Sequence, residues 1–140
     1  EYLRMLLEGH PSNGNLLHAM GCFDRLVTAL PDLAPPSQRA ATQLLQDMLV
    51  AGEVHAVQKL QILTRLLRLS QLAEPADATS LVIVHFCTRV AGHGPSRDSL
   101  YQAELATVLL HFLHRFRDLP PPALDWDLVA AVFGCLDAIL

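Results

Sequence analysis

Segments with the apolar spacing of amphipathic helices occur in pairs along this 140-residue chain, and proline or glycine separates each pair from the next. The pairs recur about every 40 residues, which is a period typical of stacked helical repeats. One segment of the first pair places these residues on one helix face: Ala41, Leu44, Leu45, Met48 and Leu49. The pattern predicts an all-α fold in which about three antiparallel helix pairs form an α-solenoid. A compact irregular helical bundle is the alternative.

Proline, glycine and capping residues set the expected limits of the helices. The expected helices span residues 15–30, 36–50, 53–72, 75–91, 97–117 and 126–140. Gly92 is expected to close the fourth helix, and Ser96 and Asp125 are expected as N-caps of the last two. The triple proline at 120–122 predicts a stiff extended connector. Residues 1–140 then form one helical segment with units at approximately 13–52, 53–92 and 96–140.

The first unit carries the clearest repeat-like stretch. Residues 26–33 read Leu-Val-Thr-Ala-Leu-Pro-Asp-Leu, and residues 37–45 read Ser-Gln-Arg-Ala-Ala-Thr-Gln-Leu-Leu. This unit resembles a HEAT repeat, whose second helix opens with an arginine, two small residues and then leucines. The matching positions here are Arg39, Ala40, Ala41 and Leu44. The second unit has Pro75 in its turn but no arginine that corresponds to Arg39, and the triple proline sets the third unit further apart.

The resemblance covers most of the chain, and the chain is similar to armadillo repeats as well. It implies a scaffold of stacked helix pairs with a curved surface that binds other proteins, or sometimes nucleic acid, without catalysis. No binding residue is implied by the repeat pattern, because that pattern is structural. Candidate contact residues therefore have to come from the surface chemistry of this chain.

Composition and charge narrow the class of partner. A hydrophobic content of 51% with only 17% charged residues rules out a disordered chain. The net charge of −4 argues against a domain that holds nucleic acid mainly through its phosphates. All ten basic residues except Lys59 are arginines, which favour planar hydrogen-bonded contacts and hence protein partners.

No pattern in the sequence indicates an enzyme, a metal site or a bound cofactor. The strongest metal-like pattern is His111 and His114 followed by Asp118, which one helix side can bring together. The adjacent Arg115 and Arg117 repel a cation, so we expect these histidines on the solvent side or at a partner surface. The glycine-rich loop at 92–96 lacks the strand of a nucleophile elbow and the lysine of a phosphate loop.

The cysteines indicate the cellular compartment of the protein, and the chain ends indicate a longer parent protein. Cys22, Cys87 and Cys135 are an odd number of widely separated thiols in apolar segments. We expect them to be buried and reduced, which indicates an intracellular protein, cytoplasmic or nuclear. No apolar run reaches the roughly 18 residues that a membrane span needs. Helical spacing starts at residue 1 and apolar residues continue to 140, so we expect a segment of a longer solenoid.

We therefore expect a non-enzymatic scaffold segment that holds partner proteins in an intracellular assembly. A preformed groove would receive a partner helix or extended segment, and flanking repeats of the same chain would stack on its ends. The expected contact residues are Gln61, Arg65, Arg68, Arg115 and Trp126. In a solenoid, Arg65 and Arg68 would align with arginines of the next unit. The alternatives are a nucleic-acid-associated helical scaffold with an arginine-rich face, and a structural spacer within a larger repeat protein.

Overall fold

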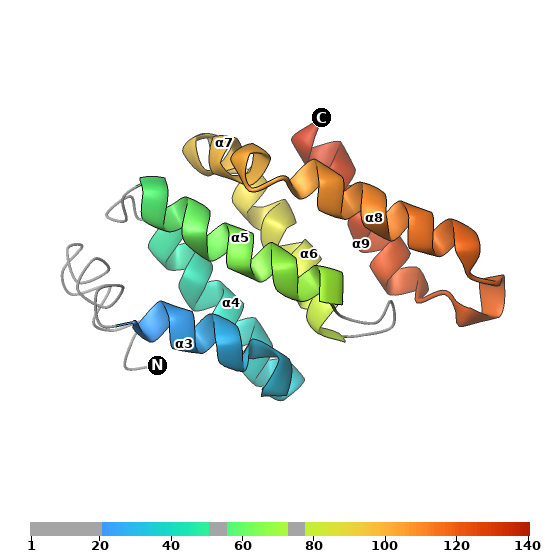
Figure 1. The fold of residues 1–140 in the computed structure, drawn as a ribbon, viewed down its shortest axis with the longest axis horizontal. Coiled ribbons are helices and arrows are strands. Elements are labelled where there is room, and N and C mark those ends of the chain that lie inside the picture. Colours follow the sequence, from blue (N-terminus) through green and yellow to red (C-terminus); the bar gives the residue numbers. More distant parts are fainter. Residues whose placement is uncertain (1–20, 51–55, 73–77) are drawn as a thin grey trace.

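The computed structural model describes residues 21–50, 56–72 and 78–140 (Figure 1). Within these ranges the chain is helical and has no strand, so the all-α prediction is confirmed for them. The α-helices are α3 (Cys22–Ala29), α4 (Pro35–Val50), α5 (Ala56–Leu72), α6 (Ala78–Ala91), α7 (Gly94–Gln102), α8 (Leu105–Asp118) and α9 (Trp126–Ile139). Two 3-10 helices, η1 (Leu30–Asp32) and η2 (Pro121–Ala123), lie in connections. The expected Pro75 turn lies outside the described residues.

The helices form two layers. One layer contains α3, α5 and α8, in which α5 packs against both α3 and α8. The other contains α4, α6 and α9, in which α6 packs against both α4 and α9, and it lies behind the first in the view of Figure 1. Contacts of α5 with α6 and of α8 with α9 join the layers, and the short α7 packs against α5, α6 and α8. Successive helix pairs are therefore neighbours in space.

Apolar side chains fill the space between the layers. Three phenylalanines are fully buried: Phe23 of α3, Phe86 of α6 and Phe112 of α8. Buried leucines from α4, α5, α7, α8 and α9 belong to the same core. Burying one such side chain contributes about 1.5–3 kcal/mol relative to leaving it in water. Residues 81–84 include three β-branched side chains, a composition that also suits a strand. They lie in α6 as expected, with Ile83 and Val84 facing the core.

Two of the expected helices are interrupted. Gly21, which precedes α3, has φ +72°, so no helix runs unbroken from 15 to 30. Glu104 has φ +63° and divides the expected helix 97–117 into α7 and α8. Leu100 and Leu105 are both buried, whereas five residues along one helix would turn them about 140° apart. The break thus lets both leucines reach the core.

The predicted caps and connectors are confirmed in part. The Asp125 side chain accepts hydrogen bonds from the amides of Asp127 (3.1 Å) and Leu128 (3.2 Å), so it is the N-cap of α9. Gly92 follows the last residue of α6 as expected. The prediction of Ser96 as an N-cap is wrong, because α7 begins two residues earlier at Gly94 and its N-cap is His93. The triple proline is extended only at its first residue and then enters η2.

Among the described parts of the chain, no helix combines the length and the apolarity that crossing a membrane requires.

Candidate functional site

The five predicted contact residues do not form one site. Gln61, Arg65 and Arg68 lie together on α5 and line a shallow pocket of about 490 Å³ at its junction with α3. Arg115 lies on α8, the other neighbour of α5 in the same layer. Trp126 is the first residue of α9 in the opposite layer, and 62% of it is exposed. The structure thus brings three of the five together.

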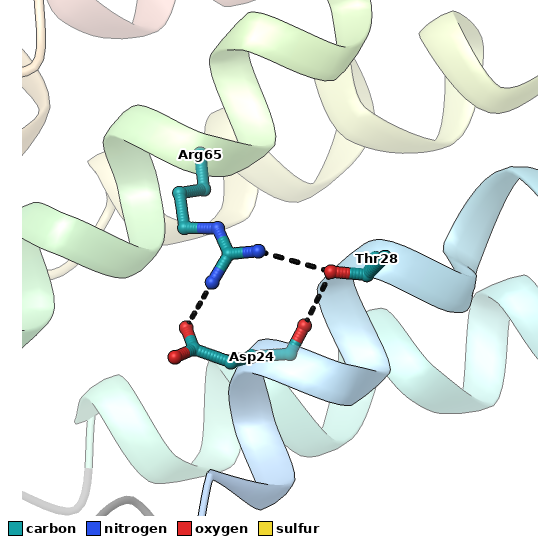
Figure 2. A network of polar contacts seen from close by, with 3 residues as sticks. All are labelled: Asp24, Thr28 and Arg65. Atoms are coloured by element: carbon teal, nitrogen blue, oxygen red, sulfur yellow. Dashed lines mark hydrogen bonds and ion pairs between the residues drawn. The ribbon is translucent and has the colours of Figure 1, made fainter.

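Arg65 is engaged within the molecule (Figure 2). Its guanidinium forms an ion pair with Asp24 of α3 and donates a hydrogen bond to the Thr28 hydroxyl at 2.9 Å. Thr28 in turn donates to the backbone carbonyl of Asp24 at 2.8 Å. This arrangement ties α5 to α3. Its side chains are about half exposed, at 42% for Arg65 and 54% for Asp24, so water screens the ion pair.

The expected arginine row across units is not made by Arg65, which turns toward α3 rather than α8. Arg117 pairs with its own neighbour Asp118, with Nε at 3.1 Å from Oδ1, and both side chains are strongly exposed. Arg68 is exposed, and its side chain has no hydrogen bond or ion pair with another described residue. Among the arginines expected in that row, all of which lie in the described part of the chain, Arg68 is the one that keeps the role of an uncommitted cation.

The opposite layer carries a groove between α4 and α6 with a volume of about 510 Å³. On α4 the lining residues include Pro35, Arg39 and Gln43, which are four apart and so share one helix face. On α6 the same spacing relates Leu81, His85 and Arg89, and the other lining residues are Thr42 and Val82. Each wall of the groove is therefore built mainly from one row of side chains.

A second groove of about 550 Å³ lies between α6 and α9. Leu81 and His85 of α6 line both grooves, so the two adjoin on either side of these side chains on the outer face of α6. On α9 the wall is made of small side chains and one acid: Asp127, Ala130, Ala131 and Gly134. A Cβ placed on Gly134 would meet no atom within 4 Å, which shows how open this wall is. We call the two grooves together the α4–α6–α9 surface.

Charge is unevenly distributed on this surface. Among the described residues that line the α4–α6 groove there are two arginines and no acid. Arg89 is held across the groove by a hydrogen bond from Nε to Gln46 Oε1 of 2.7 Å. The exposed Arg39 guanidinium has no hydrogen bond or ion pair with another described residue. The α4 side of the surface is therefore positive, whereas Asp127 makes the α9 side negative.

Exposed aromatic residues of α9 lie beside this surface. Trp126 and Phe133 are 62% and 56% exposed, and they are seven residues apart, so they lie on one face of the helix. Ala130 and Asp137 fall on the same face by their spacing. We call these four residues the α9 stripe. Because Ala130 also lines the α6–α9 groove, the stripe borders the α4–α6–α9 surface.

The cysteines are free thiols with different environments. Cys87 and Cys135 are buried, as predicted, but Cys22 is only half-buried. Burial is the main reason that the pKa of Cys87 is raised far above its ordinary value, with a further contribution from the nearby Cys135. Burial also raises the pKa of Cys135, against which a hydrogen bond with Thr88 acts. Both thiols therefore stay protonated and unreactive at neutral pH.

His111 and His114 are exposed on α8, on the solvent side as expected. Asp118, the third member of that pattern, forms its ion pair with Arg117. Within the described ranges, no three histidine, cysteine, aspartate or glutamate side chains gather as a metal site would require. The two histidines thus lie at the surface of the α3, α5 and α8 layer.

The residues that sequence reasoning missed are Arg39, His85 and Arg89. Arg39 was noted only for its place in the repeat pattern. Their four-residue spacing from Gln43 and Leu81 is visible in the sequence. The pairing of α4 with α6, which turns these two rows into one groove, is not.

Comparisons of the chain with protein-family models, with curated proteins and with solved structures find no match.

Proposed function

We propose that this chain is a segment of a non-enzymatic, HEAT/armadillo-like α-solenoid that binds partner proteins inside the cell, in the cytoplasm or nucleus. The two-layer order, in which successive helix pairs are neighbours, supports the solenoid. The observation that carries the binding role is the pair of adjoining grooves on the α4–α6–α9 surface, with arginines lining the α4–α6 groove. The partner fits as an amphipathic helix that carries acidic side chains.

The groove has the features of a helix-binding site. Leu81, Val82 and Pro35 offer apolar area to the buried side of a partner helix, and such area supplies most of the affinity of helix-in-groove complexes. The Arg39 guanidinium, which has no hydrogen bond or ion pair with another described residue, can form a bidentate pair with a carboxylate, which fixes the register. Helices on both sides hold the groove open before the partner arrives, so little ordering entropy is lost on binding.

Nucleic acid fits this surface less well. A phosphate backbone needs a continuous positive track, and the two arginines of the α4–α6 groove are followed by Asp127 at its α9 side. The net charge of −4 adds a repulsive background. Neither Asp127 nor the net charge prevents the binding of a partner's acidic helix that lies in the α4–α6 groove and ends before α9.

The test is site-specific photo-crosslinking in cells that express the chain. A benzoylphenylalanine replaces Gln43 in the α4–α6 groove or, as the matched control, Gln61 on α5, since both are exposed glutamines. We expect crosslinks from position 43 but not from 61, with mass spectrometry placing them on an acidic helical segment of the partner. Adding Arg39→Glu/Arg89→Glu should abolish these crosslinks, whereas Arg68→Glu/Arg117→Glu should not.

Crosslinks from position 61 alone would place docking on the α5 surface, where the sequence analysis had it. The absence of crosslinks from both positions would contradict a binding role and favour a structural spacer. Crosslinks from position 43 to RNA that fall steeply with added salt would replace the protein partner with nucleic acid.

A further inference from the structure

We propose that a second copy of this chain occupies the α4–α6 groove, with the α9 stripe of each copy seated between Arg39 and Arg89 of the other. The inference rests on the proposed function, because it takes the α4–α6–α9 surface as the docking surface and names its occupant. The features that carry it are the exposed aromatic residues of α9, its acids, and the shared layer of groove and stripe.

The α9 stripe has the form of a helix that docks in a groove. Trp126, Ala130, Phe133 and Asp137 follow the spacing of anchor residues along one helix face. Trp126 and Phe133 expose more than half of their area to water. Large aromatic side chains contribute most of the affinity of protein interfaces when a partner buries them, and here both lie on the same helix.

The charges of α9 and of the α4–α6 groove are complementary. Asp127 and Asp137 are exposed on α9, and the basic groups that face the α4–α6 groove are Arg39, Arg89 and His85. The acid nearest the groove on α4 is the half-buried Asp47, which accepts a hydrogen bond from Gln43 at 2.9 Å. A carboxylate of the second copy therefore meets two guanidinium groups without a competing acid in the groove lining.

The arrangement permits both contacts at once. The α4–α6 groove and α9 belong to the same layer of the molecule, on opposite sides of α6 (Figure 1). When two copies face each other through this layer about a two-fold axis, α9 of each copy lies over the basic groove of the other. The contact is thus closed and self-complementary, and it gives a dimer rather than a filament.

A charge-exchange experiment on the full 140-residue chain tests the inference. Sedimentation equilibrium is measured from about 1 µM to about 200 µM, which brackets micromolar dissociation constants. We expect the wild type to dimerise. Arg39→Glu/Arg89→Glu alone and Asp127→Arg/Asp137→Arg alone should each dimerise at least tenfold more weakly, because the α4–α6 groove and α9 then carry the same charge. An equimolar mixture of the two variants should dimerise again, since each groove meets an opposite stripe.

Two further variants guard against a trivial result. Arg68→Glu/Arg117→Glu changes the charge by the same amount on the α5 and α8 surface, and it should dimerise like the wild type. Trp126→Ser/Phe133→Ser alters only exposed side chains and should also weaken the dimer at least tenfold, so it tests the stripe if a charge variant fails to fold. Circular dichroism establishes which variants are folded.

A wild-type chain that stays monomeric throughout the range overturns the inference, and so does a mixture that fails to restore the dimer while both variants are folded. The proposed function fails separately. If the chain stays monomeric but still crosslinks from position 43 to another protein, the docking surface stands and only the second copy as its occupant is wrong. If the chain neither dimerises nor crosslinks from position 43, both proposals are wrong.

Discussion

Arg65 and Arg39 are chemically identical side chains on the two layers of this molecule, and their surroundings give them opposite roles. Arg65 of α5 meets Asp24 and Thr28 on α3, so it holds two helices together. Arg39 of α4 meets no acid on α6, so its guanidinium remains available at the edge of a groove. The residue that faces an arginine from the neighbouring helix therefore decides whether the arginine stabilises the fold or can bind a partner.

The two layers also differ in how polar contacts join their helices. The link between α3 and α5 is an exposed ion pair, which water and salt weaken. Besides the exposed bond from Arg89 to Gln46, α4 and α6 are linked by the buried Gln38, whose Nε2 donates to the carbonyl of Leu30 (3.0 Å) and to the hydroxyl of Thr79 (2.9 Å). Gln38 is only 3% exposed, so loss of its bonds is not compensated by water.

The largest expected difference is in the chemistry of the thiols. Cys87 and Cys135 in α6 and α9 are buried with raised pKa values, whereas Cys22 in α3 is half-buried. Because a buried protonated thiol reacts only after local opening, we expect a maleimide to modify Cys22 at least about a hundredfold faster than either of the others. Mass spectrometry of timed samples at pH 7 measures the three rates. Equal rates would show that the α6 and α9 core opens as freely as α3.

The next effect is on stability. Gln38→Ala should lower the free energy of unfolding by about 1–3 kcal/mol, because the Leu30 carbonyl and the Thr79 hydroxyl each lose a buried hydrogen bond and a cavity forms. Urea unfolding followed by circular dichroism measures it. Gln43→Ala on the same helix is the matched control, and since Gln43 is exposed it should change stability by less than about 0.5 kcal/mol. Equal losses for the two variants would contradict the role of Gln38.

The ion pair of the other layer should contribute less. A double-mutant cycle with Asp24→Ala and Arg65→Ala should give a coupling free energy of about 0.2–1 kcal/mol, which falls when salt is raised. Arg68→Ala in place of Arg65→Ala is the control, and we expect no coupling with Asp24. A coupling that matches the loss caused by Gln38→Ala would remove the difference between the layers.

The smallest expected effect is on the groove arginine. Arg39→Ala should change the free energy of unfolding by less than about 0.5 kcal/mol, since its guanidinium supports no other described residue. Thermal unfolding of this variant beside Arg65→Ala makes the comparison directly. If Arg39→Ala proves the more destabilising of the two, Arg39 is a structural residue and the α4–α6 groove loses its available cation.

Local sequence signals predicted most of the helices but not the places where tertiary packing overrides them. Asp125 was identified as a cap because its bonds are made to amides two and three residues away. The left-handed Glu104 was not, since its conformation depends on the burial of Leu100 and Leu105 against other helices. A glutamate carries no local preference for that backbone region.

The same limit applies to the candidate site. Gln61, Arg65 and Arg68 were expected together because one helix places them together, and they do line one pocket. Spacing along α5 says nothing about Asp24, which lies 41 residues before Arg65 in the sequence and forms an ion pair with it. The α4–α6 groove was missed for the same reason, because its two walls come from helices that the sequence does not pair.

Residue-resolved NMR on the isotopically labelled chain tests the docking surface most directly. Amide spectra are compared at about 20 µM and about 500 µM, on either side of a micromolar dissociation constant. We expect concentration-dependent shifts at Gln43, His85 and Ala130, with Thr28 and Gln61 unchanged. Shifts confined to α3 and α5, or no shifts at all, would contradict the assignment of the α4–α6–α9 surface as the place where a second copy docks.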